Sequence, residues 1–215
     1  IKYYEGDIFN SSADIICHQV NCQGAFGRGM AGQVKKLFPE VEKSYKILTK
    51  AVGQKEARGK DVGAAGAGIG QPVEKDGRWF LIANLYGQDD YGKGGVYTDY
   101  EALEKAMEEI REFLAARGRN ETAAFPQGIG CGFAGSDWQI VESIIKRVFE
   151  DYPGEVQIWN TTENKNIRYI LPHKPPYYRP QKAFPPRRHT LSPARILPAI
   201  RPATAVKTPL LPGPW

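Results

Sequence analysis

The sequence predicts a layered α/β sandwich followed by a basic tail. Over residues 1–171, segments rich in β-branched and aromatic residues alternate with amphipathic helical segments. The run 13–20 (ADIICHQV) is almost continuously apolar, as expected for a strand buried on both faces. Hydrophobic residues make up 41% of the chain and charged residues 25%, which suits a folded core.

The elements of the first half follow from local signals. A short first strand ends near Asp7, and the buried strand 13–20 leads through a glycine-rich loop to a helix over 29–38. Pro39 suits the first turn of a second helix that runs to about residue 52. Residues 62–69 (VGAAGAGI) contain too many small residues to be assigned as a strand.

The second half contains two capped helices between strands. Thr98-x-x-Glu101 and Ser136-x-x-Gln139 are capping-box patterns, and Gly118 ends the first of these helices. In the first helix, apolar residues recur at intervals of three to four and give one buried stripe, formed by Leu103, Met107, Ile110 and Leu114. The second helix carries Ile140, Ile144, Val148 and Phe149. Strands are expected over 78–86, 121–126 and 155–160.

The basic charge of the chain lies in its C-terminal part. Residues 172–215 contain eight Lys or Arg, no Asp or Glu, and twelve of the sixteen prolines, so the net charge of +5 leaves −3 for residues 1–171. The composition predicts a domain over 1–171 and a disordered or polyproline-like tail over 172–215. Contact of this tail with nucleic acid is an alternative to a passive, solvated tail, which the composition favours.

The cysteines and the hydropathy pattern restrict the class of protein. Cys17, Cys22 and Cys131 are an odd number without a C-x-x-C pair, which argues against a disulfide framework and a structural zinc site. A reducing, cytoplasmic compartment is the expected location. No apolar stretch approaches the roughly 20 residues that span a bilayer, so no membrane contact is expected.

Two glycine-rich loops, each between a strand and a helix, predict an anion site. The first runs VNCQGAFGRGMAG over 20–32, and the second runs FPQGIGCGFAG over 125–135. Glycines permit positive φ and close approach of a ligand, and a helix N-terminus favours an anion. Gly27-x-Gly29-x-x-Gly32 also matches the dinucleotide fingerprint, but two helical segments stand where its second strand belongs. Two facing loops are therefore expected to bind a diphosphate through backbone N–H groups.

Polar residues near the loops are candidates for recognition and catalysis. A carboxylate at Asp7 suits an adenine amino group, and the amide of Asn21 suits ribose hydroxyls. His18 is either a core histidine or a general acid or base, and Asp137 is either a catalytic helper or a helix-start residue.

These motifs resemble the macro domain family over residues 1–160. The similar segments are GDIF at 6–9, ADIICHQVNCQG at 13–24, GRGMA at 27–31 and PQGIGCG at 126–132. The resemblance implies a three-layer α/β/α sandwich with a central mixed sheet that binds ADP-ribose. It is closest to the branch that removes the phosphate of ADP-ribose 1″-phosphate, in which a histidine at the position of His18 is linked to catalysis. A branch that uses a lysine after the strand 78–86 is not matched, because Asn84-Leu85-Tyr86 stand there.

The resemblance implies a set of site residues and two functions. Catalysis is expected from His18, Asn21 and Asp137, without a metal or cofactor. The ADP-ribose ligands are expected to be Asp7, Ile8, Asn21, Gly27, Arg28, Gly29, Met30, Gly128, Ile129, Gly130, Cys131, Gly132 and Phe133. The first hypothesis is hydrolysis at C1″ of ADP-ribose 1″-phosphate or of an ADP-ribosylated macromolecule. The second is a non-catalytic reader of ADP-ribose.

Overall fold

The computed structural model describes residues 1–56, 65–92 and 94–160. The expected boundary at residue 171, the tail over 172–215 and residues 62–64 lie outside the described residues. The division of the chain into a domain and a tail therefore stays a prediction. No helix among the described residues is both long enough and apolar enough to cross a bilayer.

The described strands form one mixed sheet. They are β1 (Lys2–Glu5), β2 (Ile15–Asn21), β3 (Gly68–Lys75), β4 (Arg78–Gln88), β5 (Ala123–Pro126) and β6 (Val156–Asn160). Their order is β1-β6-β5-β2-β4-β3, and every neighbouring pair is parallel except β3 and β4. The mixed sheet confirms the predicted fold class.

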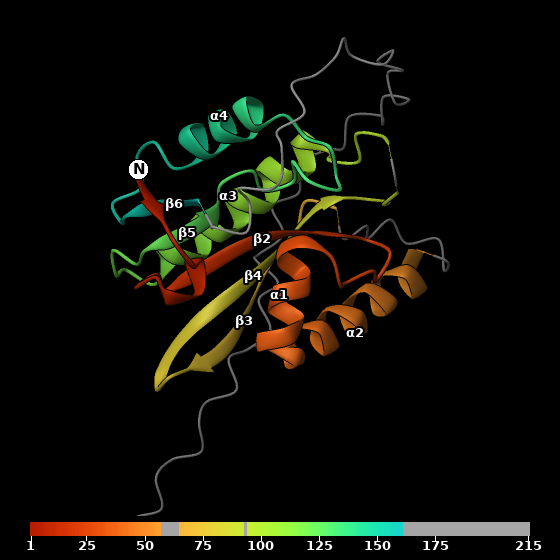
Figure 1. Ribbon diagram of the computed structural model, residues 1–215, viewed down its shortest axis with the longest axis horizontal. Helices are drawn as coiled ribbons and strands as arrows, with labels where there is room; N and C mark the ends of the chain where they lie inside the picture. The colour runs from red at the N-terminus through yellow and green to blue at the C-terminus, as the bar shows by residue number, and fades with distance from the viewer. Residues whose placement is uncertain (57–64, 93, 161–215) are drawn as a thin grey trace, which may run out of the picture.

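Helices cover both faces of this sheet. Figure 1 shows α1 (Gly29–Leu37) and α2 (Pro39–Glu56) in orange on one side, and α3 (Tyr100–Ala116) and α4 (Trp138–Val148) in green on the other. Successive residues of β2 face opposite layers, since Ile16 packs with Val41 and Ile15 packs with Leu103. Alternation along a buried strand therefore builds both halves of the core.

The chain leaves two adjacent strands in opposite directions. After β2 it forms α1 and α2 on one face of the sheet, and after β5 it forms α4 on the other face. Since β2 and β5 are neighbouring parallel strands, their carboxyl ends mark a topological switch point. Open α/β sheets bind ligands at such points.

Three local predictions differ from the structure. Part of the unassigned segment 62–69 belongs to β3, which begins at Gly68 and pairs antiparallel with β4. The α3 and α4 helices are capped by Asp99 and Asp137, one residue after the expected Thr98 and Ser136. Pairing with β4 makes β3 possible despite its small residues, and the buried hydroxyl of Thr98 instead accepts a hydrogen bond from Gln19.

Candidate functional site

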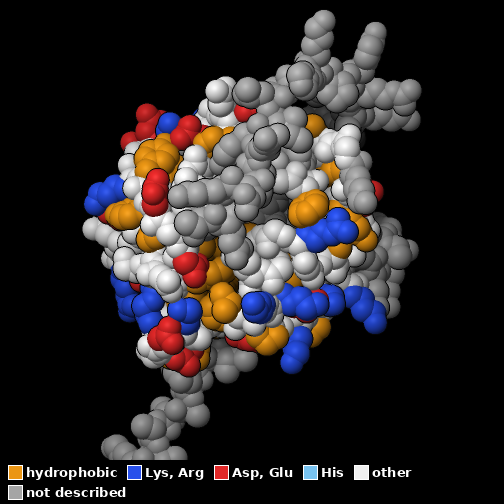
Figure 2. Space-filling model, viewed as in Figure 1, with side chains coloured by type: hydrophobic (Ala, Val, Ile, Leu, Met, Phe, Trp, Pro, Cys, Tyr) orange, Lys and Arg blue, Asp and Glu red, His pale blue; other side chains and the backbone are white. Residues whose placement is uncertain are grey.

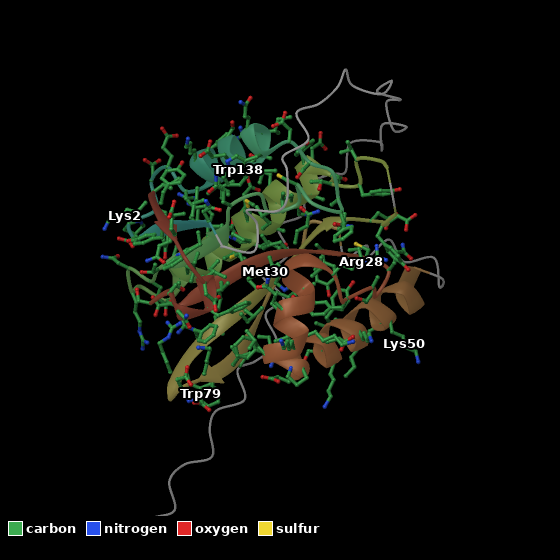
Figure 3. The ribbon with its side chains drawn as sticks, in the orientation of Figure 1. Lys2, Arg28, Met30, Lys50, Trp79 and Trp138 are labelled. Carbon is green, nitrogen blue, oxygen red and sulfur yellow. The ribbon has the colours of Figure 1, made fainter. Side chains whose placement is uncertain are left out.

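The two glycine loops lie together at the carboxyl edge of the sheet. Loop A is residues 22–28, between β2 and α1, and loop B is residues 127–137, between β5 and α4. The guanidinium carbon of Arg28 in loop A lies 5.1 Å from the ring centroid of Phe133 in loop B. Figure 3 labels Arg28 and Met30 at the start of α1. The residues 27–30 and 128–133 that the sequence assigns to a diphosphate thus share one edge.

A buried amide shapes loop A. The Asn21 side chain is at the end of β2, and its residue is only 7% exposed. Its Oδ1 accepts hydrogen bonds from the backbone N–H groups of Gln23 (3.0 Å) and Ala25 (3.1 Å) and lies 2.9 Å from the hydroxyl of Tyr45. Its Nδ2 donates to the carbonyl of Ala25 at 2.6 Å. The Asn21 side chain therefore folds the loop back on itself.

Apolar packing closes the underside of loop A. Phe26 is buried, and its ring lies 5.0 Å from that of Tyr45 and 5.6 Å from that of His18. The following residues Gly27, Arg28 and Gly29 are exposed, and Gly29 has a φ of 55°. The loop therefore hides its aromatic residue and presents its glycines to solvent.

Loop B is shaped by its backbone. Gly128, Gly130 and Gly135 have φ values of 76°, 77° and 67°, in the region that favours glycine. A Cβ atom on Gly130 would stand 2.5 Å from Oε1 of Gln19, and one on Gly135 would stand 2.5 Å from the carbonyl oxygen of Gly95. Gly130 and Gly135 are therefore required both for conformation and for space, and Gly128 for its conformation.

Loop B also provides hydrogen-bond donors that the rest of the described chain does not use. The N–H groups of Ile129 and Cys131 close turns within the loop. Among the described residues, those of Gly128, Gly130, Gly132 and Phe133 have no hydrogen-bond acceptor. Unpaired N–H groups in a turn of this kind form an anion-binding concavity. The first turn of α1 adds the free N–H groups and the positive end of a helix.

A third segment, between β4 and α3, completes this edge. Ala134 of loop B accepts hydrogen bonds from the N–H groups of Tyr97 (2.8 Å) and Thr98 (3.2 Å), and the N–H of Cys22 in loop A lies 3.1 Å from the carbonyl oxygen of Asp89. The sequence patterns did not indicate this segment. The available signal was Gln19, a polar residue in an apolar strand, whose amide donates to the side chains of Gln88 (2.8 Å) and Thr98 (2.9 Å).

His18 lies inside the core rather than at the surface of the site. Its residue is 0% exposed, and among the described residues neither ring nitrogen has a hydrogen-bond partner within bonding geometry. Burial lowers its pKa to about 4, although the Asn84 side chain opposite it in β4 opposes this shift. The imidazole is therefore neutral at physiological pH and has no solvent-exposed surface, with the Phe26 ring packed against it.

The other predicted recognition residues have structural roles as well. Asp137 caps α4 by accepting the N–H of Gln139 at 2.8 Å, which is the helix-start role that the sequence left open. Asp7 is exposed and accepts the N–H of Phe9 at 2.9 Å. Ile8 is fully buried in the core, so a ligand contact from this residue rests on its backbone. Asp7 and Ile8 follow β1 at the same edge as the loops, and the short helix η1 (Ile8–Asn10) contacts β5.

The layer formed by α1 and α2 is basic, although residues 1–171 carry a net negative charge. Figure 2 shows Lys and Arg side chains gathered over these helices. Glu42 pairs with Lys35 (3.1 Å) and Lys46 (2.8 Å). Three further lysines, at 36, 43 and 50, are exposed. An anion that approaches loop A therefore meets a local positive field. No group of His, Cys, Asp and Glu able to hold a metal ion is present among the described residues.

Comparison with known proteins gives named relatives for this fold. No protein-family model matches the chain. An uncharacterized 17.5 kDa protein from the tk-vs intergenic region of Enterobacteria phage T4 is 30% identical over 148 residues, covering 67% of this chain and 87% of the phage protein. The ADP-ribose 1″-phosphate phosphatase of Saccharomyces cerevisiae is 24% identical over 181 residues, covering 73% of this chain and 94% of the yeast protein.

A solved structure agrees with these sequence matches. The macrodomain of Mycobacterium tuberculosis DarG superposes with a TM-score of 0.59 at 21% identity, covering 75% of this chain and 97% of that domain. At this identity the match shows the fold, and the match extends over nearly the whole of the solved domain.

Proposed function

We propose that this chain, which has the macrodomain fold, binds ADP-ribose through its diphosphate between loops A and B. The observation that carries this proposal is the row of backbone N–H groups in loop B without an acceptor among the described residues, at Gly128, Gly130, Gly132 and Phe133. The N-terminus of α1 and the basic layer beside it supply positive potential from the other side. The yeast relative whose name includes ADP-ribose 1″-phosphate supports the same ligand class.

Asp7 and Asn21 have different places in this binding scheme. The exposed carboxylate of Asp7 remains the proposed acceptor for the adenine amino group. The Oδ1 atom of Asn21 already has three donors around it, which leaves the second hydrogen of Nδ2 as its free capacity. Asn21 is therefore proposed to act on the ligand chiefly by holding the backbone of loop A in place.

Hydrolysis at C1″ is the second candidate function, favoured by the match over 94% of the yeast phosphatase. In this reaction water attacks the phosphorus of the 1″-phosphate, and the products are ADP-ribose and inorganic phosphate. The burial of His18 beneath Phe26 favours a reader instead, because a general base must reach the water that it activates. ADP-ribosylated macromolecules and a cytoplasmic location stay predictions.

Binding is tested by titration calorimetry with ADP-ribose, ADP, NAD and ADP-ribose 1″-phosphate. We expect Gly29→Val to weaken ADP-ribose binding at least tenfold, because a β-branched residue resists the φ of 55° and fills space beside the ligand. Gly77→Val is the matched control, since Gly77 also has positive φ and open surroundings but lies in the turn between β3 and β4. Equal affinity for ADP-ribose in wild type and a folded Gly29→Val variant would contradict the assignment of loop A.

Phosphate release from ADP-ribose 1″-phosphate separates the two functions. An enzyme that uses His18 loses its rate in His18→Ala, whereas a reader releases no phosphate in any variant. Asp137→Asn keeps an oxygen that caps α4 but removes the carboxylate. A rate that falls in Asp137→Asn, with the protein still folded, assigns Asp137 to catalysis, and an unchanged rate leaves it as a cap.

A further inference from the structure

Arg28 and Phe133 form a side-chain contact that joins loop A to loop B. The guanidinium carbon lies 5.1 Å from the centroid of the ring, within the range of a cation–π interaction. Both side chains are on the surface, and Phe133 is 60% exposed. Neither residue is needed for the core. The contact therefore closes the two loops over each other from the solvent side.

The position of Arg28 beside the helix dipole is electrostatically unfavourable. Arg28 is the N-cap residue of α1, and its side chain makes no capping hydrogen bond. A cation at this end of a helix is repelled by the positive end of the helix dipole. Among the described residues, no carboxylate lies within 4 Å to offset this repulsion. The ring of Phe133 is the partner that remains.

A phosphate group competes well for this guanidinium. An exposed cation–π contact shifts an equilibrium by a factor of about two to five, whereas a charge-assisted hydrogen bond from Arg contributes about tenfold or more. A phosphate between the loops also neutralises the charge that α1 repels. The interaction of Arg28 with a phosphate is therefore expected to be stronger than its interaction with the ring of Phe133.

We propose that Arg28 and Phe133 form a clasp over loops A and B, in which Arg28 rests on Phe133 until a phosphate of the ligand takes over its guanidinium. This inference rests on the proposed function, because it concerns the same site. In this arrangement Arg28 selects ligands that carry a negatively charged phosphate. The ring of Phe133 competes with that phosphate for the guanidinium of Arg28. The phosphate is either the diphosphate or the 1″-phosphate, which share this chemistry.

A double-mutant cycle tests the clasp. Dissociation constants for ADP-ribose and ADP-ribose 1″-phosphate are measured by titration calorimetry on wild type, Arg28→Gln, Phe133→Leu and the double variant. We expect Arg28→Gln to weaken binding about tenfold or more. We expect Phe133→Leu to tighten binding about two- to fivefold when Arg28 is present and to have no effect in the Arg28→Gln background.

The two ligands identify the phosphate. Equal weakening of both by Arg28→Gln assigns the guanidinium to the diphosphate, and weakening of ADP-ribose 1″-phosphate alone assigns it to the terminal phosphate. Arg117→Gln is the control, since Arg117 makes a comparable contact with Phe113 at 5.3 Å on α3, away from the loops. We expect this variant to keep wild-type affinity.

Three results would overturn proposals at different levels. Binding that is unaffected by Arg28→Gln overturns the clasp and leaves the proposed function intact. If Phe133→Leu weakens binding both in the wild-type background and in the Arg28→Gln background, Phe133 contacts the ligand directly. That result also overturns the clasp. A wild-type protein that binds neither nucleotide overturns the proposed function together with the clasp.

Discussion

Loops A and B look alike in sequence but are built by different means. Each follows a parallel strand, contains several glycines and precedes a helix. Loop A is shaped by side chains, since Asn21 and Tyr45 hold its backbone and Phe26 fills the space beneath it. Loop B is shaped by its backbone, with three positive-φ glycines, two of which (Gly130 and Gly135) pack against neighbouring segments. A glycine-rich pattern thus does not say which force holds a loop in place.

The difference predicts different sensitivities to substitution. A Cβ atom on Gly27 of loop A, or on Gly29 at the start of α1, would meet no heavy atom within 4 Å, so these positions have open space. The corresponding test at Gly130 or Gly135 of loop B gives overlaps with Gln19 or Gly95. Substitution of the polar and aromatic residues that contact loop A should therefore disrupt its conformation. In loop B, substitution of the glycines should have this effect.

The largest expected effect is that of Gly135→Ala in loop B. Alanine at a φ of 67° is strained, and its Cβ atom would stand 2.5 Å from the carbonyl oxygen of Gly95. Strain and overpacking together should lower the free energy of unfolding by about 3 kcal/mol. Urea denaturation measures this loss. Gly132→Ala in the same loop is the control and should change stability by less than about 0.5 kcal/mol, because no atom surrounds its Cβ position. Equal stability of the two variants would mean that loop B does not depend on its backbone conformation.

The sequence predicted the layers and the helices well because their signals are local and periodic. The stripe from Leu103 to Leu114 identifies the buried face of α3 directly. Strand β3 was missed because its pairing with β4, rather than its own residues, stabilises it. The same limit applies to the site. Asn21 was found at the end of a strand, but its bond to Tyr45, 24 residues later, depends on how α2 packs. The strand pattern placed His18 on a strand buried on both faces, but it did not show that both ring nitrogens would lie without a hydrogen-bond partner among the described residues.

Low pH should reduce the free energy of unfolding through His18, whose ring packs against Phe26 of loop A. Burial lowers the pKa of His18 to about 4 in the folded protein, against about 6.5 in the unfolded chain. The unfolded chain therefore binds the proton first, so this contribution to stability is complete above pH 6.5 and is lost as the pH falls to about 4. The shift corresponds to about 3 kcal/mol.

The contribution of the imidazole is measured by comparing wild type with His18→Leu, which lacks it. Urea denaturation of wild type and His18→Leu between pH 7 and pH 4 separates His18 from the carboxylates, which both proteins share. We expect wild type to lose more stability over this range by about 3 kcal/mol. Parallel pH profiles would show that His18 reaches solvent in the folded protein, and that result would restore it as a candidate general base.

The smallest expected effect is that of Asn21→Ala, and it tests whether loop A is held separately from loop B. The variant removes the acceptor for the N–H groups of Gln23 and Ala25 and the donor to the carbonyl of Ala25. Water replaces part of this bonding because Gln23 is exposed, so the loss in unfolding free energy should be about 2 kcal/mol. Hydrogen exchange should quicken over residues 22–28 and stay unchanged over 127–135.

Asn10→Ala, which removes only an exposed contact with Lys75, should leave both loops unchanged. Faster exchange in both loops of Asn21→Ala would show that the clasp and the β4–α3 segment couple them into one unit. Faster hydrogen exchange in loop A alone means that the two loops of the proposed diphosphate site hold their conformations independently. Binding then requires only that the ligand contact both loops, without a change in the conformation of either loop.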